Sequence, residues 1–369
     1  MNKKQAFTVC AVYCAIILFF SSALILTPKK DFSPNENRML SKMPRLSAES
    51  LVCGEFTQRF ASFCSDHMAF RDPLLSLNSS FELGLGKLEV GNVMKGRNHN
   101  LIKRLEYNDY SKLEENIKAV EKIRGFANSH GAKSIFFCAP RSVDVLCDFC
   151  PPLFDTKKSD KVWEHVKNAE TVNELLRKKA NEGEYVFYKT DHHWTTLGAY
   201  YAYRGLGEKL NFKPYALSDF EAETVCENFY GTTYSSSLLP RTSPDKITAF
   251  RYEEDTTIKL TDMSTGKELP LYDYSAIEGS SKYDFFLGGN RAWLRVESQD
   301  KPRLVLVKDS FANSLVPFLA RHFNIDVIDP RYIREPLDVV LTKLYEGDEK
   351  PALLLLFGVD TLAGDVGLG

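Results

Sequence analysis

Short apolar runs alternate with longer amphipathic segments through most of this chain. The runs that predict buried strands are residues 134–139, 184–189, 304–307, 325–328 and 353–357. Apolar positions that recur every three or four residues predict helices over 109–129, 159–183, 195–210, 313–322 and 337–345. Strands that alternate with helices of this length form a mostly parallel sheet with both faces covered. The sequence therefore predicts a three-layer α/β domain.

Two further regions frame this α/β pattern. Residues 51–88 read as largely helical, with a break at Arg71-Asp72-Pro73, and residues 92–101 predict a hairpin or a turn. Residues 215–300 instead carry short β-like runs between turn residues, at 246–252, 257–260, 283–287 and 292–296. We interpret 215–300 as a β-rich insertion into one α/β domain that extends over residues 51–369.

The N-terminal segment is different in kind. Lys3 and Lys4 precede an uncharged, mostly apolar run from Ala6 to Leu26, and about 20 apolar residues suffice to span a bilayer as a helix. A cleaved signal peptide with a site near residues 21–23 is the alternative, although cleavage there would leave an apolar new N-terminus. We favour an uncleaved anchor over residues 1–27, followed by a polar, proline-bearing tether over 28–50.

Charge and cysteine content narrow the classes of partner. A formal net charge of -2 argues against nucleic acid, which needs a basic footprint. Cys147 and Cys150 form a lone CxxC pair, which alone cannot complete a tetrahedral zinc site. Outside the membrane this pair, or Cys53 with Cys64, is a potential disulfide.

Chemistry-bearing residues follow two of the predicted strands. Asp191, His192 and His193 come after the run 184–189, and Ser310 comes after the run 304–307. The carboxyl ends of parallel strands line the crevice in which α/β proteins bind ligands. An aspartate can fix the tautomer of a histidine that then takes the proton of a serine. The parts of a Ser–His–Asp nucleophile system are therefore expected at one edge of the sheet.

Two other interpretations of these residues stay open at this point. Asp191, His192 and His193 also have the composition of a metal-binding cluster, although neighbouring residues rarely point into one coordination sphere. Asp191 and Asp309 are also good N-caps for the helices that begin shortly after them, with the histidines then merely polar surface residues.

The sequence resembles a known family in several segments. The string Thr190-Asp191-His192-His193-Trp194-Thr195 is similar to the signature of the bacterial DHHW protein family. The other segments that resemble this family are Phe32-Ser33 with Glu36-Asn37-Arg38, Asp66 with Phe70-Arg71-Asp72, Phe229-Tyr230-Gly231-Thr232, and Lys308-Asp309-Ser310-Phe311. The family is in turn distantly similar to the SGNH-like proteins of alginate O-acetylation. The resemblance therefore implies an SGNH-hydrolase-like fold.

The resemblance also implies roles for particular residues. Asp191 becomes the orienting acid, His193 the base and Ser310 the nucleophile, whereas His192 occupies a variable position. We expect oxyanion or substrate contacts from Asn313, Asn290 and Trp194, and neither a metal nor a cofactor. Lys308 stands where the family of SGNH enzymes usually has a glycine, and we expect its side chain to narrow the serine turn.

These expectations lead to one functional hypothesis and one alternative. The hypothesis is a single-pass membrane protein with an extracytoplasmic catalytic domain, which acts as an O-acetyltransferase or esterase on a cell-surface polysaccharide. As a transferase it would need a partner such as a membrane-bound O-acyltransferase to supply the acyl group. The alternative is an inactive envelope protein that binds glycan or scaffolds a polysaccharide-modification complex.

Overall fold

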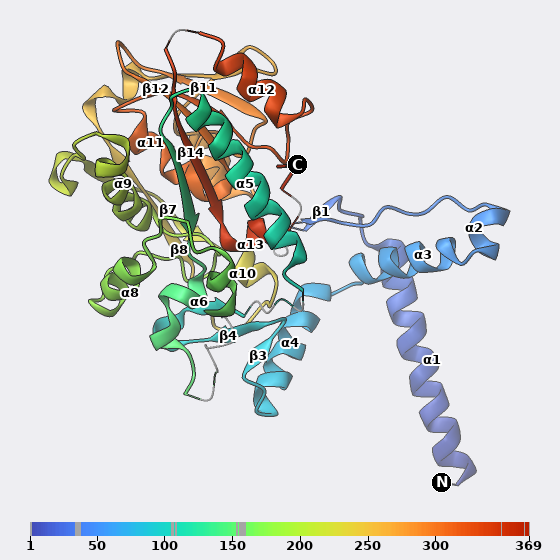
Figure 1. The fold of residues 1–369 in the computed structure, drawn as a ribbon. Helices are drawn as coiled ribbons and strands as arrows, with labels where there is room; N and C mark the ends of the chain where they lie inside the picture. Colours follow the sequence, from blue (N-terminus) through green and yellow to red (C-terminus); the bar gives the residue numbers. More distant parts are fainter. Residues whose placement is uncertain are drawn as a thin grey trace. The chain divides into compact units, whose positions relative to one another are not determined.

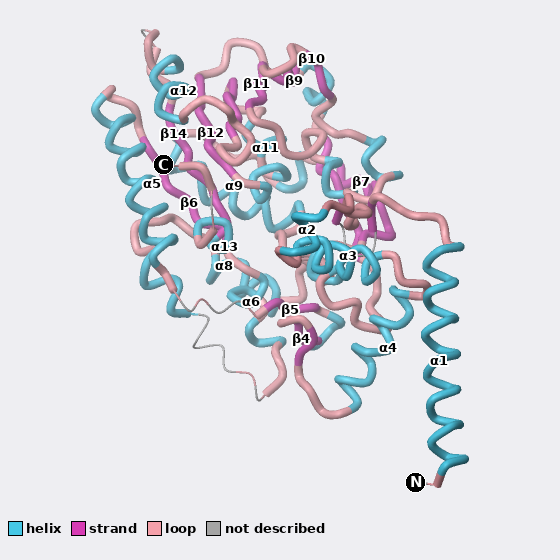
Figure 2. The backbone as a smooth tube through the Cα atoms, turned by 90° about the vertical axis from the view of Figure 1, so that its right-hand side faces the viewer, coloured by secondary structure: helices cyan, strands magenta, loops and turns pink. Residues whose placement is uncertain are grey.

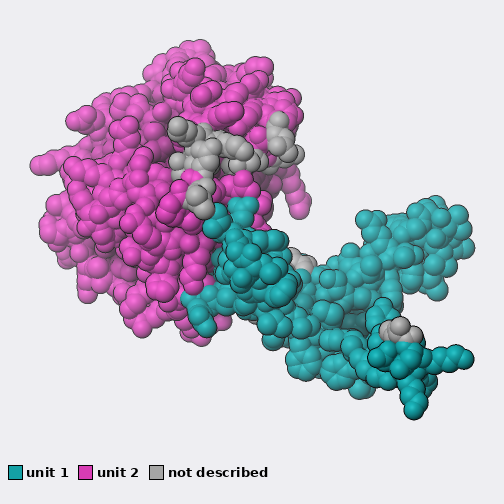
Figure 3. Space-filling model, turned by 90° about the horizontal axis from the view of Figure 1, so that it is seen from below, with its two compact units in different colours: residues 1–90, 234–241 teal, residues 91–233, 242–369 magenta. Residues whose placement is uncertain are grey.

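The computed structural model describes residues 2–33, 38–104, 107, 109–152, 154, 160–347, 349–364 and 366–368. The chain divides into two compact units, residues 1–90 with 234–241, and residues 91–233 with 242–369 (Figure 3). Glu36 and Asn37, from one of the family-like segments, and Ser159, the first residue of a predicted helix, lie outside the described residues. The domain bounds expected from the sequence stay a prediction.

The first unit begins with one long apolar helix, α1 (Lys3–Leu26). Its mean hydropathy of 2.6 and its length are sufficient to cross a membrane, and none of its residues is buried. A signal sequence near an N-terminus has the same properties, so the anchor and signal interpretations both stand.

Three helices and three very short strands complete the described part of this unit. They are β1 (Phe32–Ser33), β2 (Arg38–Met39), α2 (Ala48–Val52), α3 (Glu55–Asp66), α4 (Arg71–Gly84) and β3 (Glu89–Val90). The predicted break in this helical region lies slightly earlier than Arg71-Asp72-Pro73, at residues 67–70 between α3 and α4. Pro73 lies in the first turn of α4, where a backbone N–H has no helical partner and its loss is harmless.

The second unit is built on a seven-stranded sheet in the order β10–β9–β11–β13–β12–β14–β6. Its strands are β6 (Ser134–Ala139), β9 (Lys259–Asp262), β10 (Lys267–Leu269), β11 (Trp293–Glu297), β12 (Arg303–Lys308), β13 (Asn324–Ile328) and β14 (Ala352–Gly358). Strands β13, β12, β14 and β6 are parallel, as predicted. The sheet as a whole is mixed, which corrects the expectation of a parallel sheet, because β9, β10 and β11 join it antiparallel.

Helices cover both faces of this sheet (Figures 1 and 2). One face packs on α5 (Ser111–Ser129), α12 (Leu337–Leu344) and α13 (Val359–Leu362). The other packs on α8 (Asn173–Asn181), α9 (Thr196–Leu210) and α11 (Val316–Leu319). Successive side chains of a strand point to opposite faces, so Leu353 and Leu355 of β14 enter the first core and Leu354 and Leu356 the second. Burial on both faces explains why these strands read as continuous apolar runs.

Several predicted elements take another form. Residues 184–189 are buried at Val186–Tyr188 but form no strand, since the chain turns back and Phe187 makes an isolated bridge with Trp194. The predicted helix 159–183 is divided into η3 (Lys161–His165) and α8. Residues 313–322 contain η8 (Ser310–Ser314) and α11, interrupted near Pro317, whose missing N–H disfavours one continuous helix. Residues 282–285 form the 3₁₀ turn η7 rather than a strand.

The remaining elements are hairpins and short turns. The hairpin strands are β4 (Val93–Lys95) with β5 (Leu101–Lys103), and β7 (Glu221–Phe229) with β8 (Asp245–Arg251). The short helical turns are η1 (Arg97–His99), α6 (Ser142–Val145), η2 (Cys147–Phe149), η4 (Leu217–Asp219), α10 (Thr232–Ser235), η5 (Glu253–Thr257) and η6 (Tyr274–Glu278). All eight cysteines lie among the described residues and are free thiols, so neither potential disulfide is formed.

Candidate active site

Ser310 begins a helical turn directly after β12. Asp309 caps this turn, because its Oδ1 accepts a hydrogen bond from the backbone N–H of Phe311 at 2.9 Å. The other carboxylate oxygen accepts from the N–H of Gly358, at the end of the neighbouring strand β14, at 2.7 Å. A Cβ on Gly358 would lie 2.6 Å from the Phe311 ring, so a larger residue there would displace the ring. The cap is therefore made by Asp309, and the hydroxyl of Ser310 is left to face the site.

The loop that carries Asp191 and His193 is held by a buried carboxylate from another segment. Asp245, the first residue of β8, is 2% exposed. It accepts hydrogen bonds from the N–H groups of Lys189 (2.9 Å) and Thr190 (2.7 Å), and from the hydroxyl of Tyr185. This carboxylate fixes the backbone immediately before Asp191, where no regular strand is present.

Asp191 uses both of its carboxylate oxygens. Oδ1 lies 2.5 Å from Nδ1 of His193 and accepts from the His193 backbone N–H at 3.0 Å. Oδ2 accepts from the backbone N–H of Thr232 at 2.8 Å and from its hydroxyl at 3.1 Å. A Cβ on Gly231 would lie 2.2 Å from the Cβ of Asp191, so Thr232 reaches the carboxylate only because glycine precedes it.

The other side of the His193 ring faces the serine. Nε2 of His193 lies 2.8 Å from Oγ of Ser310. With Nδ1–H donating to Asp191, Nε2 is free to accept the serine proton. Tyr283 stacks on the His193 ring, with centroids 4.1 Å apart and an interplanar angle of 8°. Asp191 and His193 are buried, and Ser310 is half-buried, so the serine is the member of this chain that solvent or a substrate reaches.

The electrostatics keep the acid ionised. Burial raises the pKa of Asp191, but His192, His193 and the hydrogen bonds from His193 and Thr232 outweigh it and hold the pKa well below its usual value. A carboxylate that remains charged can fix the tautomer of His193 and stabilise its protonated form.

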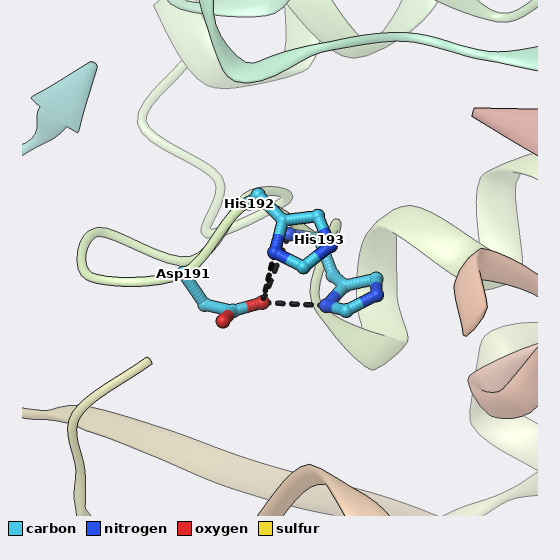
Figure 4. A group of neighbouring side chains, drawn as sticks. All are labelled: Asp191, His192 and His193. Atoms are coloured by element: carbon cyan, nitrogen blue, oxygen red, sulfur yellow. Dashed lines mark hydrogen bonds and ion pairs between the residues drawn. The ribbon is translucent and has the colours of Figure 1, made fainter. Parts of the chain in front are cut away.

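His192 lies beside this chain without joining it. Its Nδ1 lies 2.6 Å from the Thr232 hydroxyl. Figure 4 shows the His192 ring beside the carboxylate of Asp191, from which Nδ1 lies 3.7 Å away. Burial of most of the ring and the charge of His193 lower the pKa of His192 to about 3, although 40% of the side chain remains exposed at its edge. His192 is thus a neutral neighbour that supports Thr232.

The metal interpretation can be tested on the same atoms. One ligand atom from each of Asp191, His192 and His193 lies within 4.8 Å of the others. The 2.5 Å separation between Asp191 and His193 is that of a hydrogen bond, whereas two ligands about 2.1 Å from a tetrahedral zinc lie more than 3 Å from each other. The other carboxylate oxygen of Asp191 already accepts two hydrogen bonds from Thr232. The arrangement therefore fits proton transfer better than metal ligation.

The three expected contact residues have different surroundings. Trp194 is fully buried, and its indole N–H donates to the carbonyl of Phe311 (3.0 Å) and the hydroxyl of Ser314 (3.2 Å). Trp194 therefore stabilises η8, which we call the serine turn, through these two hydrogen bonds. Because the ring is buried, it does not reach a substrate. Asn313 lies within the serine turn, and its Nδ2 donates to Oδ1 of Asn290 at 3.1 Å.

Lys308 does not narrow the turn as expected. Its side chain is 0% exposed, and its Nζ bonds to Asn290, to Asp329 and to Asn313 of the turn itself. Lys308 is the last residue of β12, so its side chain points out from the face of the sheet. The tight turn begins one residue later, at Asp309.

Sequence reasoning missed several residues that build this site. Thr232 and Gly231 lie in a segment that resembled the family, so a signal was present, but their bond to Asp191 was not expected. Asp245 and Tyr283 come from the region interpreted as an insertion. Nothing in the sequence spacing connects them to the loop that carries Asp191 and His193, which we call the acid–base loop. Their roles depend on contacts between segments that are distant in the sequence.

The fold and this hydrogen-bond chain define an α/β protein with a mixed sheet that brings an aspartate, a histidine and a serine into contact. Residues 160–328 match the model of the family described as DHHW protein, which confirms the resemblance. No curated protein matches the chain.

Solved structures share the fold. A DHHW family protein from Eubacterium siraeum superposes with a TM-score of 0.58 at 20% identity, covering 75% of this chain and 94% of its own. Bacillus cereus PatB1 gives 0.60 at 18%, covering 74% and 98%, and its structure with a sulfonyl adduct gives 0.59 at 17%. The O-acetyltransferase domain of Pseudomonas putida AlgJ, at 16% identity and a TM-score of 0.44, is too distant to support an inference. These similarities establish the fold alone. The chemistry has to be inferred from the residues of the site.

Proposed function

We propose that this chain is a serine acyl-ester enzyme that uses Ser310 as nucleophile, His193 as general base and Asp191 as the orienting acid. The observation that carries the proposal is the continuous hydrogen-bond chain from Asp191 through His193 to Ser310, with separations of 2.5 and 2.8 Å. Because Ser310 reaches solvent while its two partners are buried, the chain activates a nucleophile that a substrate can approach.

The reaction follows from the proton positions. Nε2 of His193 takes the Ser310 proton as Oγ bonds to the acyl carbonyl carbon, and the carbonyl oxygen becomes an oxyanion. The intermediate collapses, the alkoxide leaves with the proton from His193, and the acyl group stays on Ser310. An incoming hydroxyl then gives its proton to His193 as its oxygen bonds to the acyl carbon. The bond from that carbon to Oγ breaks, and Ser310 recovers the proton from His193.

Two donors suit the oxyanion. The backbone N–H of Ser310 lies at the start of a helical turn, where it has no helical acceptor. The amide of Asn313, three residues later, is the second candidate, because one of its N–H groups remains after the bond to Asn290.

The substrate class rests on the family resemblance. The DHHW-like segments and their distant similarity to alginate O-acetylation proteins favour an acetyl group on a cell-surface polysaccharide. Helix α1 supports membrane attachment, and a substrate at the cell surface would require the α/β unit to lie outside the cytoplasm. A transferase would receive its acyl group from a membrane-bound O-acyltransferase, whereas an esterase would use water as acceptor.

The test is turnover of an activated acetyl ester by the full-length protein in detergent. We expect the wild type to release acetate, and Ser310→Ala to lose this activity while its thermal unfolding is unchanged. Ser129→Ala, at an exposed serine of α5, is the matched control and should retain the wild-type rate. Addition of an oligosaccharide separates the two reactions, because a transferase would form acetylated sugar at the expense of free acetate.

One result would replace the proposal with the alternative function. If the folded wild type neither turns over the ester nor reacts with a sulfonyl fluoride at Ser310, the chain is an envelope protein that kept the fold without the chemistry. Glycan binding by that protein would then be the activity to measure.

A further inference from the structure

Lys308 is a fully buried lysine two residues before the proposed nucleophile. Its Nζ lies 2.7 Å from Oδ1 of Asn313, 3.0 Å from Oδ1 of Asn290 and 3.5 Å from Oδ2 of Asp329. An ammonium has three N–H groups and no acceptor. Each of its three protons therefore has one oxygen partner, from three separate segments of the second unit.

The contacts of Lys308 fix the orientation of two side-chain amides. Since an ammonium only donates, the atom that each asparagine turns toward it must be the carbonyl oxygen. The NH₂ groups of both asparagines consequently point away from Lys308. One N–H of the Asn313 amide donates a hydrogen bond to Oδ1 of Asn290. The second N–H is the one that we assign to the oxyanion.

We infer that Lys308 is a positioning residue that orients the amide of Asn313, braced by Asn290, toward the oxyanion formed at Ser310. The inference rests on the proposed function and adds a residue to it. Lys308 touches neither substrate nor nucleophile in this role, because it acts through the two asparagines.

The three side-chain atoms that contact Nζ of Lys308 are oxygen acceptors, so the lysine is the donor in each contact. Burial lowers the pKa of Lys308, but the neighbouring carboxylate of Asp329 opposes this effect. Asp329 is itself fully buried and is held by Arg331, with contacts of 2.8 and 2.6 Å to Nε and Nη2. Loss of one of the three oxygen partners would leave the buried charge of Lys308 partly unpaired, which costs free energy. The bond from Lys308 therefore holds the side chain of Asn313 in one orientation.

Asn290 is brought to Lys308 by a loop that requires glycine. Gly288 and Gly289 have φ values of +66° and +86°, in the left-handed region. A Cβ on Gly289 would also lie 2.8 Å from the carboxylate of Asp284. Lys308 thereby connects the insertion to the serine turn, and the site depends on both.

The competing explanation is that Lys308 only stabilises the fold through its ion pair with Asp329. The two explanations differ in what happens when the asparagines are absent. If Lys308 acts through them, its removal should cost nothing further in a protein that lacks both amides. A residue that only stabilises the serine turn should reduce the rate in either background.

The experiment is a mutant cycle on the full-length protein in detergent, with p-nitrophenyl acetate as substrate. Removing one oxyanion donor lowers kcat by about 10²–10³-fold, so we expect Asn313→Ala to lose activity in this range. Lys308→Met should lower kcat by at least ~10-fold with little change in KM. In the Asn290→Ala/Asn313→Ala background, the added Lys308→Met should change kcat by less than about twofold.

Arg331→Met is the matched control, because it removes the other cation of Asp329 without touching either asparagine. We expect it to lower thermal stability and to reduce kcat by less than Lys308→Met does, since Lys308 keeps its bonds to both asparagines. If Lys308→Met fails to fold, Lys308→Gln takes its place in the cycle, since its amide still donates and should retain an intermediate kcat.

Each outcome decides between the explanations. A Lys308→Met loss of kcat that persists in the double-asparagine background, or a kcat equal to that of the wild type, would overturn the positioning role while leaving the proposed function intact. Absence of wild-type turnover together with no labelling of Ser310 would instead remove the proposed function, and the inference with it.

Discussion

Ser310 follows β12, a strand paired with parallel neighbours on both sides, whereas Asp191 and His193 lie in a loop that no regular strand precedes. The serine turn is joined to the end of β14 by the Asp309 carboxylate. The acid–base loop depends on side chains from distant segments, chiefly Asp245 and Thr232. Backbone pairing in the sheet thus positions one half of the site, and individual polar side chains position the other.

This difference has a consequence for mutational sensitivity. A strand end is defined by many backbone hydrogen bonds, so the loss of one side chain leaves most of its geometry in place. A loop held by a few buried side-chain contacts loses a large share of them with each substitution. Conservative substitutions in the acid–base loop should therefore reduce activity more than equivalent ones around the serine turn.

The largest effect is expected from Asp191→Asn. The amide cannot hold the required histidine tautomer, and the equivalent change in a serine protease lowers kcat by about 10⁴-fold. We expect a loss of this order, with thermal unfolding close to that of the wild type. The measurement is kcat with an activated acetyl ester. A folded variant that retains a tenth or more of wild-type activity would exclude Asp191 as the orienting acid.

A pair of glycine substitutions compares the two halves directly. Gly231→Ala puts a Cβ 2.2 Å from Asp191, and Gly358→Ala puts one 2.6 Å from the Phe311 ring. We expect Gly231→Ala to lower kcat by about 10²-fold, since a misplacement of about 1 Å has this cost. Gly358→Ala should have the smaller effect on kcat, because an aromatic ring can shift while Asp309 keeps its cap. An equal or greater loss in Gly358→Ala would contradict the comparison.

The sequence predicted the strand-based half of the site far better than the other. The runs 134–139 and 353–357 became β6 and β14 because burial on both faces leaves only apolar residues. The run 184–189 also has an apolar centre, at residues 185–188, but it forms a buried loop, and periodicity alone cannot distinguish the two. Composition also did not indicate that β9, β10 and β11 of the insertion pair with the main sheet. Such pairing depends on the geometry of the turns between strands.

The site shows the same division. Asp191, His193 and Ser310 were selected from two local strings, and the structure brings them into hydrogen-bond distance. Thr232 and Tyr283 were missed because their contacts with Asp191 and His193 join distant segments. Lys308 was noticed but misinterpreted, since a charged residue in an apolar run gives no sign of which oxygens it will meet.

A smaller effect is expected at the end of β14, where α13 begins. Burial raises the pKa of Asp360 from 3.8 to about 6, and Tyr107 donates a 2.5 Å hydrogen bond to it. An acid whose folded pKa is raised stabilises the protein below its unfolded pKa and loses that contribution as pH rises through the folded pKa. Stability from Asp360 should therefore decline between pH 4 and 6.

Asp360→Asn removes this titration. Because part of the Asp360 side chain reaches solvent, we expect the variant to gain about 1 kcal/mol relative to the wild type between pH 4 and 7, or about 2–4 °C in Tm. Thermal unfolding at several pH values measures the gap. A gap that stays constant with pH, or that shrinks as pH rises, would show that Asp360 is not the titrating group.

The smallest effect concerns the metal alternative for the acid–base loop. If Asp191, His192 and His193 act as a proton-transfer loop, dialysis against EDTA should leave kcat unchanged. Elemental analysis of the dialysed protein is the control. A loss of activity that Zn²⁺ restores would mean that this loop is a metal site and that the two halves of the site are organised differently from our account.

The most direct test of the central claim is to trap the acyl-enzyme. Full-length protein in detergent is mixed with excess activated acetyl ester, quenched in acid at early times, and digested for peptide mass analysis. Our account predicts one acetyl group on Ser310, absent from Ser310→Ala, and more persistent when the second step is slowed by withholding a sugar acceptor. Acetylation confined to lysines, or equal in wild type and Ser310→Ala, would contradict it.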